Sequence, residues 1–483
     1  NDLATEVITG SRNGYARFVG TLSKQDDYED GGGDSVHSEH ERWSTSAIAG
    51  WTPDRDTNIE FTYERSDAEA AYDDRAMDGI VFDRTSYRLS ASRDNLTSWL
   101  TRVEASAFYN DMHHEMDNFR LRDPGMMTMA RVVDRNTLGG RMGADMDLVP
   151  ATDIHAGVDF STNEHADSGR IMEMGNPLAA LNFRSVKTPD IAEFSDFGVF
   201  ADMERELDRN SWLTLGIRGD YHEAEVLADS YSDAERGETD TRTQWSGFGR
   251  YEVALQNLPV NLYAGLGRSE RAPDFWERDR DFSISNESLT QVDAGLSLNH
   301  RRVEGTIAVF HGWYDDYILI TEQGASARNI DAITRGIEAD LAVDLTTTLT
   351  LNSTFAYTRS TNDSDNEPLA QTPPMEGTLG LDYARGGYSA GMLWRGVARQ
   401  DRIDPGNGTI YSLDTRETPG FATLSLHAGM RLLGQSRLSA GIDNVFDRRY
   451  AEHIQRGSAD LGASSTPVNE PGRIIWANLT TEF

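Results

Sequence analysis

Residues 108–118, FYNDMHHEMDN, hold a dense group of possible metal ligands. Met112, His113, His114 and Met116 lie there among three acidic residues within seven positions. Imidazole binds both oxidation states of copper, whereas the thioether of methionine is a soft ligand that favours Cu(I). Oxygen ligands alone would instead favour calcium or magnesium. The stretch therefore predicts either a copper site or the solvated end of a strand.

The residues before this stretch alternate between apolar and polar, as in a strand with two different faces. Odd positions from 103 to 109 are apolar, and positions 102, 104, 106 and 110 are polar. Continued forward, this register puts Met112, His114 and Met116 on the polar, lumenal face and His113 and Glu115 on the opposite face, unless a β-bulge exchanges the faces. His114 and Met116 then have Cα atoms about 6.5 Å apart, so that both side chains can reach one ion.

The same alternation recurs along the chain, for example in IEADLAVDL at 337–345 and in residues 424–432. Each short turn signal joins two such segments into a pair, and a long polar and acidic segment connects one pair to the next. The turn signals are SRNG at 11, TPDRDT at 52, DNLTS at 94, PATD at 150, DRNS at 208, QNLP at 256, HRR at 300, TTT at 346, RGG at 385 and GQS at 434. The pattern predicts hairpins with tight turns on one side and long loops on the other.

This pattern is typical of an all-β fold, a transmembrane antiparallel β-barrel of the outer-membrane type. A β-propeller would need four short strands in each repeat instead of two long ones. Tryptophans support the barrel, because Trp51, Trp99 and Trp212 adjoin tight turns while Trp43 and Trp245 begin strands that return from long loops. They form two girdles, one at each membrane interface.

The number of strands predicts what the chain contains. Ten strand pairs around the tight turns plus one last strand give about 21, whereas single-chain bacterial barrels have even numbers. We therefore expect a 22-stranded type from which the first strand is missing. Such a barrel is wide enough to need a plug in its lumen, and no plug-like sequence is present. Since the start NDLATEVITG shows neither an initiator Met nor a signal-peptide pattern, we expect residues 1–483 to be a barrel domain without its plug.

Composition excludes several classes of function. The chain has no Cys, which excludes disulfides and cysteine-based zinc or redox sites. Its 79 acidic residues outnumber 45 Lys and Arg, for a net charge of −34, which argues against nucleic acid and favours cations as partners. The sequence shows no nucleophile with a base, no phosphate-binding loop and no paired catalytic carboxylates. We therefore do not expect an enzyme.

Several stretches resemble the TonB-dependent receptor family of Gram-negative bacteria. They are GLGRSERAPDFWE at 265–277, NESLTQVDAGL at 286, GIDNVFDRRYAEH at 441–453 and the final EPGRIIWANLTTEF, which alternates up to a terminal aromatic residue. The resemblance covers essentially the whole chain. It implies a location in the outer membrane, contact with lipopolysaccharide and outer-membrane lipid, and a monomer. It also implies energised transport with the TonB–ExbB–ExbD system, acting through an N-terminal part that this chain lacks.

Within that family the chain resembles the copper receptors. The residues that carry this resemblance are DRAMDG at 74, YNDMHHEMDNFRLR at 109, IMEMGNPL at 171 and PLAQTPPMEG at 368. The copper-receptor pattern has His-x-Met at this point, and His114-Glu115-Met116 matches it. The resemblance thus implies that His114 and Met116 bind a copper ion, with Cu(I) favoured over Cu(II), and that a plug supplies further ligands, including a Cys.

Two other functions remain open at this stage. A siderophore receptor would offer Arg and aromatic side chains to an anionic iron chelate, yet these loops are acidic and contain methionine. A barrel without transport activity would act as a surface receptor or a passive pore, which the net charge would bias towards cations.

Further methionines lie in the expected outer segments. Eight of the 14 methionines fall there, between Met77 and Met174. Exposed methionines suggest a surface that collects Cu(I), whereas methionines that fill gaps in loops would suggest packing alone.

Overall fold

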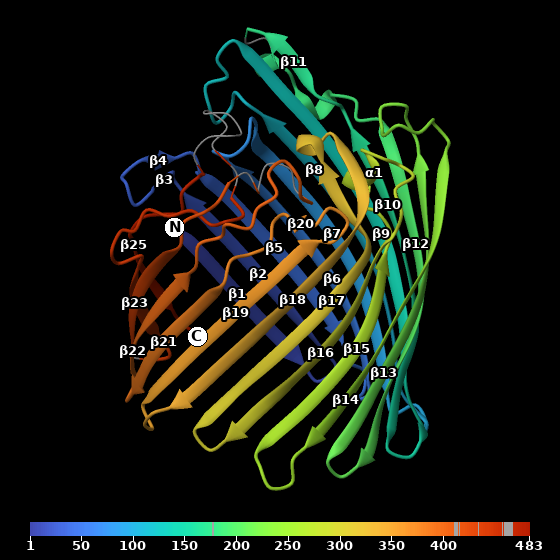
Figure 1. Ribbon diagram of the computed structural model, residues 1–483, viewed down its shortest axis with the longest axis vertical. Coiled ribbons are helices and arrows are strands. Elements are labelled where there is room, and N and C mark those ends of the chain that lie inside the picture. The colour runs from blue at the N-terminus through green and yellow to red at the C-terminus, as the bar shows by residue number, and fades with distance from the viewer. Residues whose placement is uncertain (176–177, 410–413, 415, 433, 456, 458–466) are drawn as a thin grey trace.

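The computed structural model describes residues 1–175, 178–409, 414, 416–432, 434–455, 457 and 467–483. In these residues one sheet of 23 strands, antiparallel throughout, rolls into a tall barrel, as Figure 1 shows, and β3 and β4 form a small separate sheet. Among the described residues, no helix has the length and hydropathy needed to cross a membrane.

The predicted strand count is confirmed. Two members of the large sheet are short, β11 (Ile171–Met174) and β20 (Glu367–Pro368), and 23 less these two leaves 21 long strands in the described chain. The long strands are β1 (Asp2–Ser11), β2 (Gly14–Gln25), β5 (His40–Trp51), β6 (Thr57–Ala70), β7 (Asp78–Asp94), β8 (Leu100–Asp117), β9 (Met127–Val149), β10 (Thr152–Asp167), β12 (Asp190–Asp208), β13 (Ser211–Val226), β14 (Thr239–Ala254), β15 (Val260–Arg271), β16 (Glu287–His300), β17 (Val303–Thr321), β18 (Ser326–Asp344), β19 (Leu349–Asn362), β21 (Glu376–Arg385), β22 (Tyr388–Val397), β23 (Phe421–Arg431), β24 (Arg437–Asp443) and β25 (Ile474–Thr480). The shorter elements are β3 (Tyr28–Glu29), β4 (Ser35–Val36), α1 (Phe275–Arg278), η1 (Leu178–Ala180), η2 (Phe183–Ser185) and η3 (Glu322–Gly324).

All ten predicted turns connect neighbouring strands at one end of the barrel, the lower end in Figure 1, and the long segments lie at the other. Residue 433, in the last of these turns, lies outside the described residues. Positive φ angles allow the tightest reversals, as at Gly386 and Gly387, with φ values of 58° and 89°. Glycine adopts this conformation without the steric cost that a side chain would add.

The two faces of the sheet differ in polarity. Large apolar side chains such as Phe160, Val199 and Ile217 point outward and are exposed, because the bilayer is their solvent. The lumenal face is charged: Arg218 donates hydrogen bonds to Asp159 at 2.8 Å and to Asp220 at 2.9 Å. This division is the one that the alternating sequence predicts.

At the loop end, α1 lies between β15 and β16 and carries part of the RAPDFWE motif. Asp274 and Glu277 form a capping box that fixes its first turn. Arg271 donates to both carboxylate oxygens of Glu277 at 2.8 Å and also pairs with Glu287. Phe275 packs beside a buried apolar cluster of β12, β13 and the loop that follows them. The motif thus anchors one outer loop to the barrel wall.

The first and last strands have one hydrogen-bonded neighbour each, β2 for β1 and β24 for β25, within the described part of the chain. At the loop end, residues 28–34 nevertheless contact residues 448–449 and 469–472, and we call this contact the rim clasp. Tyr28 donates to the carbonyl oxygen of Asn469 at 2.6 Å, and the amide of Asn469 donates to Asp30 at 2.7 Å. Arg449 forms an ion pair with Asp30 at 3.0 Å. The backbone N–H of Gly472 also donates to the carbonyl oxygen of Glu29 at 2.9 Å. The clasp therefore connects the two ends of the sheet through side chains and backbone.

Candidate metal site

The candidate ligands lie near the loop end of β8. β8 pairs with β9 without a register shift from Arg102 to Asp117, and the one irregularity falls before Arg102. Alternation is therefore unbroken across the stretch. Met112, His114 and Met116 share the lumenal face, as the sequence predicts.

The outer face of β8 shows where the membrane ends. Tyr109 is its last apolar residue on that face, and the next positions on the same side are Asp111, His113, Glu115 and Asp117. A tilted strand crosses the hydrocarbon in about 9–11 residues, and β8 has 18. The candidate ligands thus lie above the membrane, at the mouth of the barrel.

The neighbouring strand β7 shapes the site around His114. Gly79 lies opposite Met116, and Phe82 opposite His114, with Ile80 as the extra residue of a bulge between them. A Cβ atom on Gly79 would lie 2.2 Å from the Phe82 ring, so only glycine leaves room for that ring. Phe82 stacks on the imidazole of His114, with ring centroids 4.2 Å apart and an interplanar angle of 26°.

This environment makes His114 a suitable ligand. Its Nε2 atom is buried and has no hydrogen-bond partner. Burial, helped by the positive charges of Arg75 and His113, lowers the pKa of His114 to about 4. The imidazole is therefore neutral, and a neutral imidazole has one nitrogen with a free lone pair. A buried nitrogen without a partner is costly unless a ligand completes it.

His113 has the opposite environment, on the outer face. Its Nδ1 lies 2.6 Å from Asp134 and its Nε2 lies 3.2 Å from Glu115. Burial alone would lower the pKa of His113, but the hydrogen bonds to these two carboxylates outweigh it and raise the pKa. His113 thus holds its proton more tightly than an ordinary histidine, and a protonated imidazole cannot bind a metal.

Met112 lies on the correct face but beside two cations. Its direct neighbours across the strands are Arg84 and Arg135. Their hydrogen bonds go to the amides of Asn110 and Asn163, which do not neutralise them. Met116 instead lies between Gly79 and Arg131, and Asp167 pairs with Arg131 at 2.9 Å. The electrostatics therefore favour Met116 over Met112 as a ligand of a cation.

The loops around the site are held by Asp78, which is fully buried. It accepts hydrogen bonds from Arg122 Nε at 2.8 Å and from the backbone N–H of Tyr72 at 2.9 Å. The Nε2 atom of His37 lies 3.2 Å from the Asp78 carboxylate. Burial would raise the pKa of Asp78, but these hydrogen bonds hold it below the usual value. Asp78 therefore fixes the loops and is occupied by these partners.

Carboxylate and imidazole groups alone do not build a metal site here. No group of three or more His, Asp or Glu side chains able to hold a metal ion occurs in the described residues. His114 and Met116 would thus supply two ligands from the barrel, one nitrogen and one sulfur. Residues 176 and 177 of the IMEMGNPL stretch lie outside the described residues.

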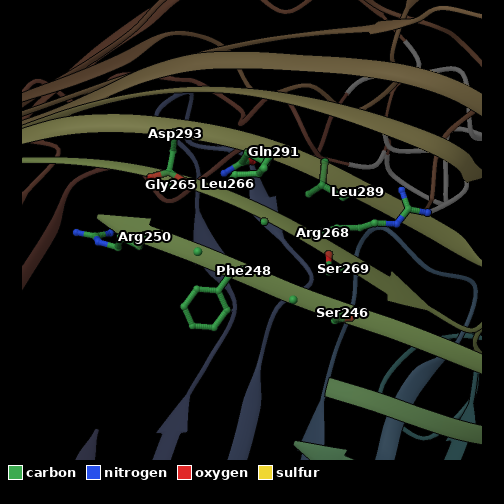
Figure 2. A pocket seen from close by; sticks show the side chains of 13 residues that line it. Ser246, Phe248, Arg250, Gly265, Leu266, Arg268, Ser269, Leu289, Gln291 and Asp293 are labelled. Atoms are coloured by element: carbon green, nitrogen blue, oxygen red, sulfur yellow. The ribbon is translucent and has the colours of Figure 1, made fainter. Parts of the chain in front are cut away.

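A separate hollow of about 500 Å³ lies in the lumenal wall across β14, β15 and β16, and Figure 2 shows its lining. Gly265 and Gly267 form its middle row because they carry no side chains on that face. Phe248, Arg250 and Asp293 surround them. The lining of the hollow has two cations, Arg250 and Arg268, one carboxylate, Asp293, and no soft ligand, so its chemistry differs from that of the candidate metal site.

Comparison with known proteins identifies the fold. The sequence model described as "TonB dependent receptor-like, beta-barrel" matches residues 20–445. Among solved structures, the copper transporter OprC superposes with a TM-score of 0.93 at 35% identity, over 99% of this chain and 77% of that one. The FrpB iron transporter from Neisseria meningitidis has a TM-score of 0.76 at 14% identity, which shows the fold alone.

Curated relatives are more distant. A ferric enterobactin receptor of Pseudomonas aeruginosa is 24% identical over 333 residues, which cover 59% of this chain and 42% of the relative. The metal-pseudopaline receptor CntO of the same species is 25% identical, over 49% of this chain and 35% of the relative. The chain thus spans about half or less of the curated relatives that it matches.

These matches confirm two expectations from the sequence, an outer-membrane location in a Gram-negative bacterium and a receptor or transporter class that does not contain enzymes. The chain belongs to the TonB-dependent receptor-like β-barrel family.

Proposed function

We propose that the complete receptor imports copper ions, which His114 and Met116 capture at the mouth of the barrel. One observation carries the proposal: the buried Nε2 of a neutral His114 has no hydrogen-bond partner, and Met116 lies two residues further on the same face. An imidazole and a thioether at this spacing suit a copper ion, and the thioether favours Cu(I).

Charge and relatives support copper as the cargo. The net charge of −34 attracts cations to the mouth. The copper transporter OprC is similar over 99% of this chain. In the complete protein, we propose that an N-terminal plug supplies the remaining ligands and that the TonB–ExbB–ExbD system acts on this plug to release the ion. The receptor would act as a monomer among lipopolysaccharide and other outer-membrane lipids.

Import of an iron chelate is the second candidate, because ferric enterobactin receptors are among the relatives. The hollow of Figure 2 supports this candidate, since Arg250 and Phe248 are the kinds of side chain that an anionic aromatic chelate needs. The mouth near His114 offers soft and acidic groups instead. The two cargoes would therefore bind to different parts of the barrel.

Metal analysis of the complete receptor, isolated from its own membrane, tests the proposal. We expect copper in the wild type and its loss when His114→Ala and Met116→Ala are combined. His113→Ala is the matched control, because its side chain faces away, and should keep the copper. Unchanged copper in the double variant would refute the site. Binding of a ferric chelate without any copper would favour the second candidate.

A further inference from the structure

We propose that the outer wall of the barrel binds a phosphate group of lipopolysaccharide between Arg335 of β18 and Arg359 of β19. The site rests on the proposed contact with lipopolysaccharide and not on copper as the cargo. Lipid A, the membrane anchor of lipopolysaccharide, carries phosphate groups at the level where its acyl chains begin. Arginine suits such a group, because its planar guanidinium can donate two parallel hydrogen bonds to phosphate oxygens.

Arg335 and Arg359 are direct cross-strand neighbours on the outer face of the sheet. Alternation puts Arg335 on the same side of β18 as Leu341, and Arg359 on the same side of β19 as Phe355, and both of these apolar side chains are exposed. The two arginines are exposed as well. Cβ atoms of directly paired residues lie about 4.5–5.5 Å apart, so both guanidinium groups can reach one ligand.

The positive charge of this pair is not neutralised within the protein. Neither Arg335 nor Arg359 forms a hydrogen bond or an ion pair with any residue that the structure describes. Like charges directly opposite each other destabilise a sheet. The chain has a net charge of −34, yet no carboxylate is placed to compensate these two cations. An anion from outside the chain would remove the repulsion.

Other cations near the loop end of the outer face do have acidic partners. They form the ion pairs Lys24–Glu41, at 2.6 Å, and Arg65–Asp83, at 3.0 Å. Such ion pairs are the ordinary way to place a cation on this surface. The pair of Arg335 and Arg359 departs from it, which points to a ligand that supplies the negative charge.

The height of the pair is that of the outer membrane interface. Arg359 lies about ten residues beyond Leu349, where β19 begins at a tight turn, and a tilted strand crosses the hydrocarbon in about 9–11 residues. Trp313 and Tyr357, both exposed on the outer face near this level, are typical of an interfacial aromatic girdle. Because the tight turns of such barrels face the periplasm, the pair lies in the outer leaflet, which consists of lipopolysaccharide.

Two further basic side chains flank the pair. His311 of β17 lies directly opposite Arg335. Arg402, which follows β22, donates to the hydroxyl group of Thr361 at 3.3 Å, two residues beyond Arg359 on the same face of β19. Burial and the positive charge of Arg359 lower the pKa of Arg402, and its buried Nε has no hydrogen-bond partner. An anion here would thus relieve three guanidinium groups together.

The wall below the pair fits the acyl chains of a lipid. Ile307 and Val309 of β17 and Phe355 of β19 are exposed on the outer face, in the rows next to the arginines on the side of the tight turns. In Figure 1 the three strands β17, β18 and β19 lie side by side. Two cations directly above an apolar wall favour a phosphorylated lipid over a soluble phosphate ion.

Native mass spectrometry of the complete receptor, delipidated in detergent and mixed with purified lipid A, tests the site. We expect Arg335→Gln with Arg359→Gln to lower the apparent affinity about tenfold or more, because charge-assisted hydrogen bonds are lost. Lys24→Gln with Arg65→Gln is the matched control. It removes the same charge from the same face, but from cations that already have carboxylate partners, and should bind lipid A as the wild type does. Equal binding by the wild type and the Arg335, Arg359 variant would refute the site.

The chemistry of the added lipid identifies the ligand. Lipid A without its phosphate groups should bind weakly and equally to the wild type and to the Arg335, Arg359 variant. If inorganic phosphate or phosphatidylglycerol binds the wild type as well as lipid A does, the assignment to lipopolysaccharide is overturned. Heat-modifiable migration on gels shows that each barrel is folded. The variant should keep the copper content of the wild type, so this proposal and the copper site can fail separately.

Discussion

At the proposed site, acid should scarcely weaken the binding of copper or silver, because the imidazole of the proposed ligand His114 is already neutral. Protons compete with a metal for the imidazole only as the pH falls towards the pKa, and burial lowers that pKa to about 4. An ordinary histidine, with a pKa near 6.5, would be only about one-tenth neutral at about pH 5.5, which would weaken the apparent affinity about tenfold. With a pKa of about 4, nearly all of His114 remains neutral at that pH.

Phe82→Ala should remove this protection. The Phe82 ring covers the imidazole at a centroid distance of 4.2 Å, and its loss would let water reach His114 and return the pKa towards the ordinary value. We expect apparent affinity in the variant to fall by up to about tenfold between about pH 7 and 5.5, while the wild type hardly changes. Titration calorimetry on the complete receptor with Ag(I) measures both. Phe108→Ala is the control, because Phe108 lies on the same face of β8 as His114 but does not cover its imidazole. A tenfold loss already in the wild type would refute the argument.

Two further predictions concern the loop end. Glu277→Ala should free α1 from the barrel wall, because Arg271 loses both hydrogen bonds to a buried carboxylate. Proteases should then cleave the chain within residues 272–285 faster. Cleavage at the wild-type rate would count against the anchoring role. Asp30→Ala should weaken the rim clasp by about 1–3 kcal/mol, because Asn469 and Arg449 lose a buried partner. Folded and unfolded barrels migrate differently on gels, and the temperature at which the band of the folded barrel disappears should fall. Asp26→Ala, on the same exposed loop, should leave that temperature unchanged.

Much of the fold could be predicted because a barrel strand leaves a simple signal. Its two faces meet different solvents, so polarity alternates, and each tight turn needs residues that reverse the chain. The ten turns and 21 long strands follow from these two signals alone. The rim clasp does not, because Asp30 and Arg449 are 419 positions apart and nothing local connects them. The short strand β11 was likewise not predicted, because it lies within a long segment between two long strands.

The candidate site shows the same limit. Strand parity correctly separated His113 from His114, since the register of β8 is unbroken. Parity could not rank Met112 against Met116, because the neighbours that decide it, Arg84 and Arg135, belong to other strands. The role of Gly79 was also missed. Its sequence signal, a glycine directly after Asp78 at the start of a strand, becomes informative only once Phe82 is known to fold over it.

His114 and Met116 lie on β8 above the membrane, which explains how one strand can both cross the bilayer and present ligands. Within the bilayer, the outer face of β8 must be apolar and its lumenal face polar. Beyond Tyr109 neither demand applies, and the strand continues with fixed spacing but free choice of side chains. The outer face then takes up His113 and Glu115, which bond to the loops, and the lumenal face is left for soft ligands. A strand that continues beyond the membrane thus positions the proposed ligands more rigidly than a loop would.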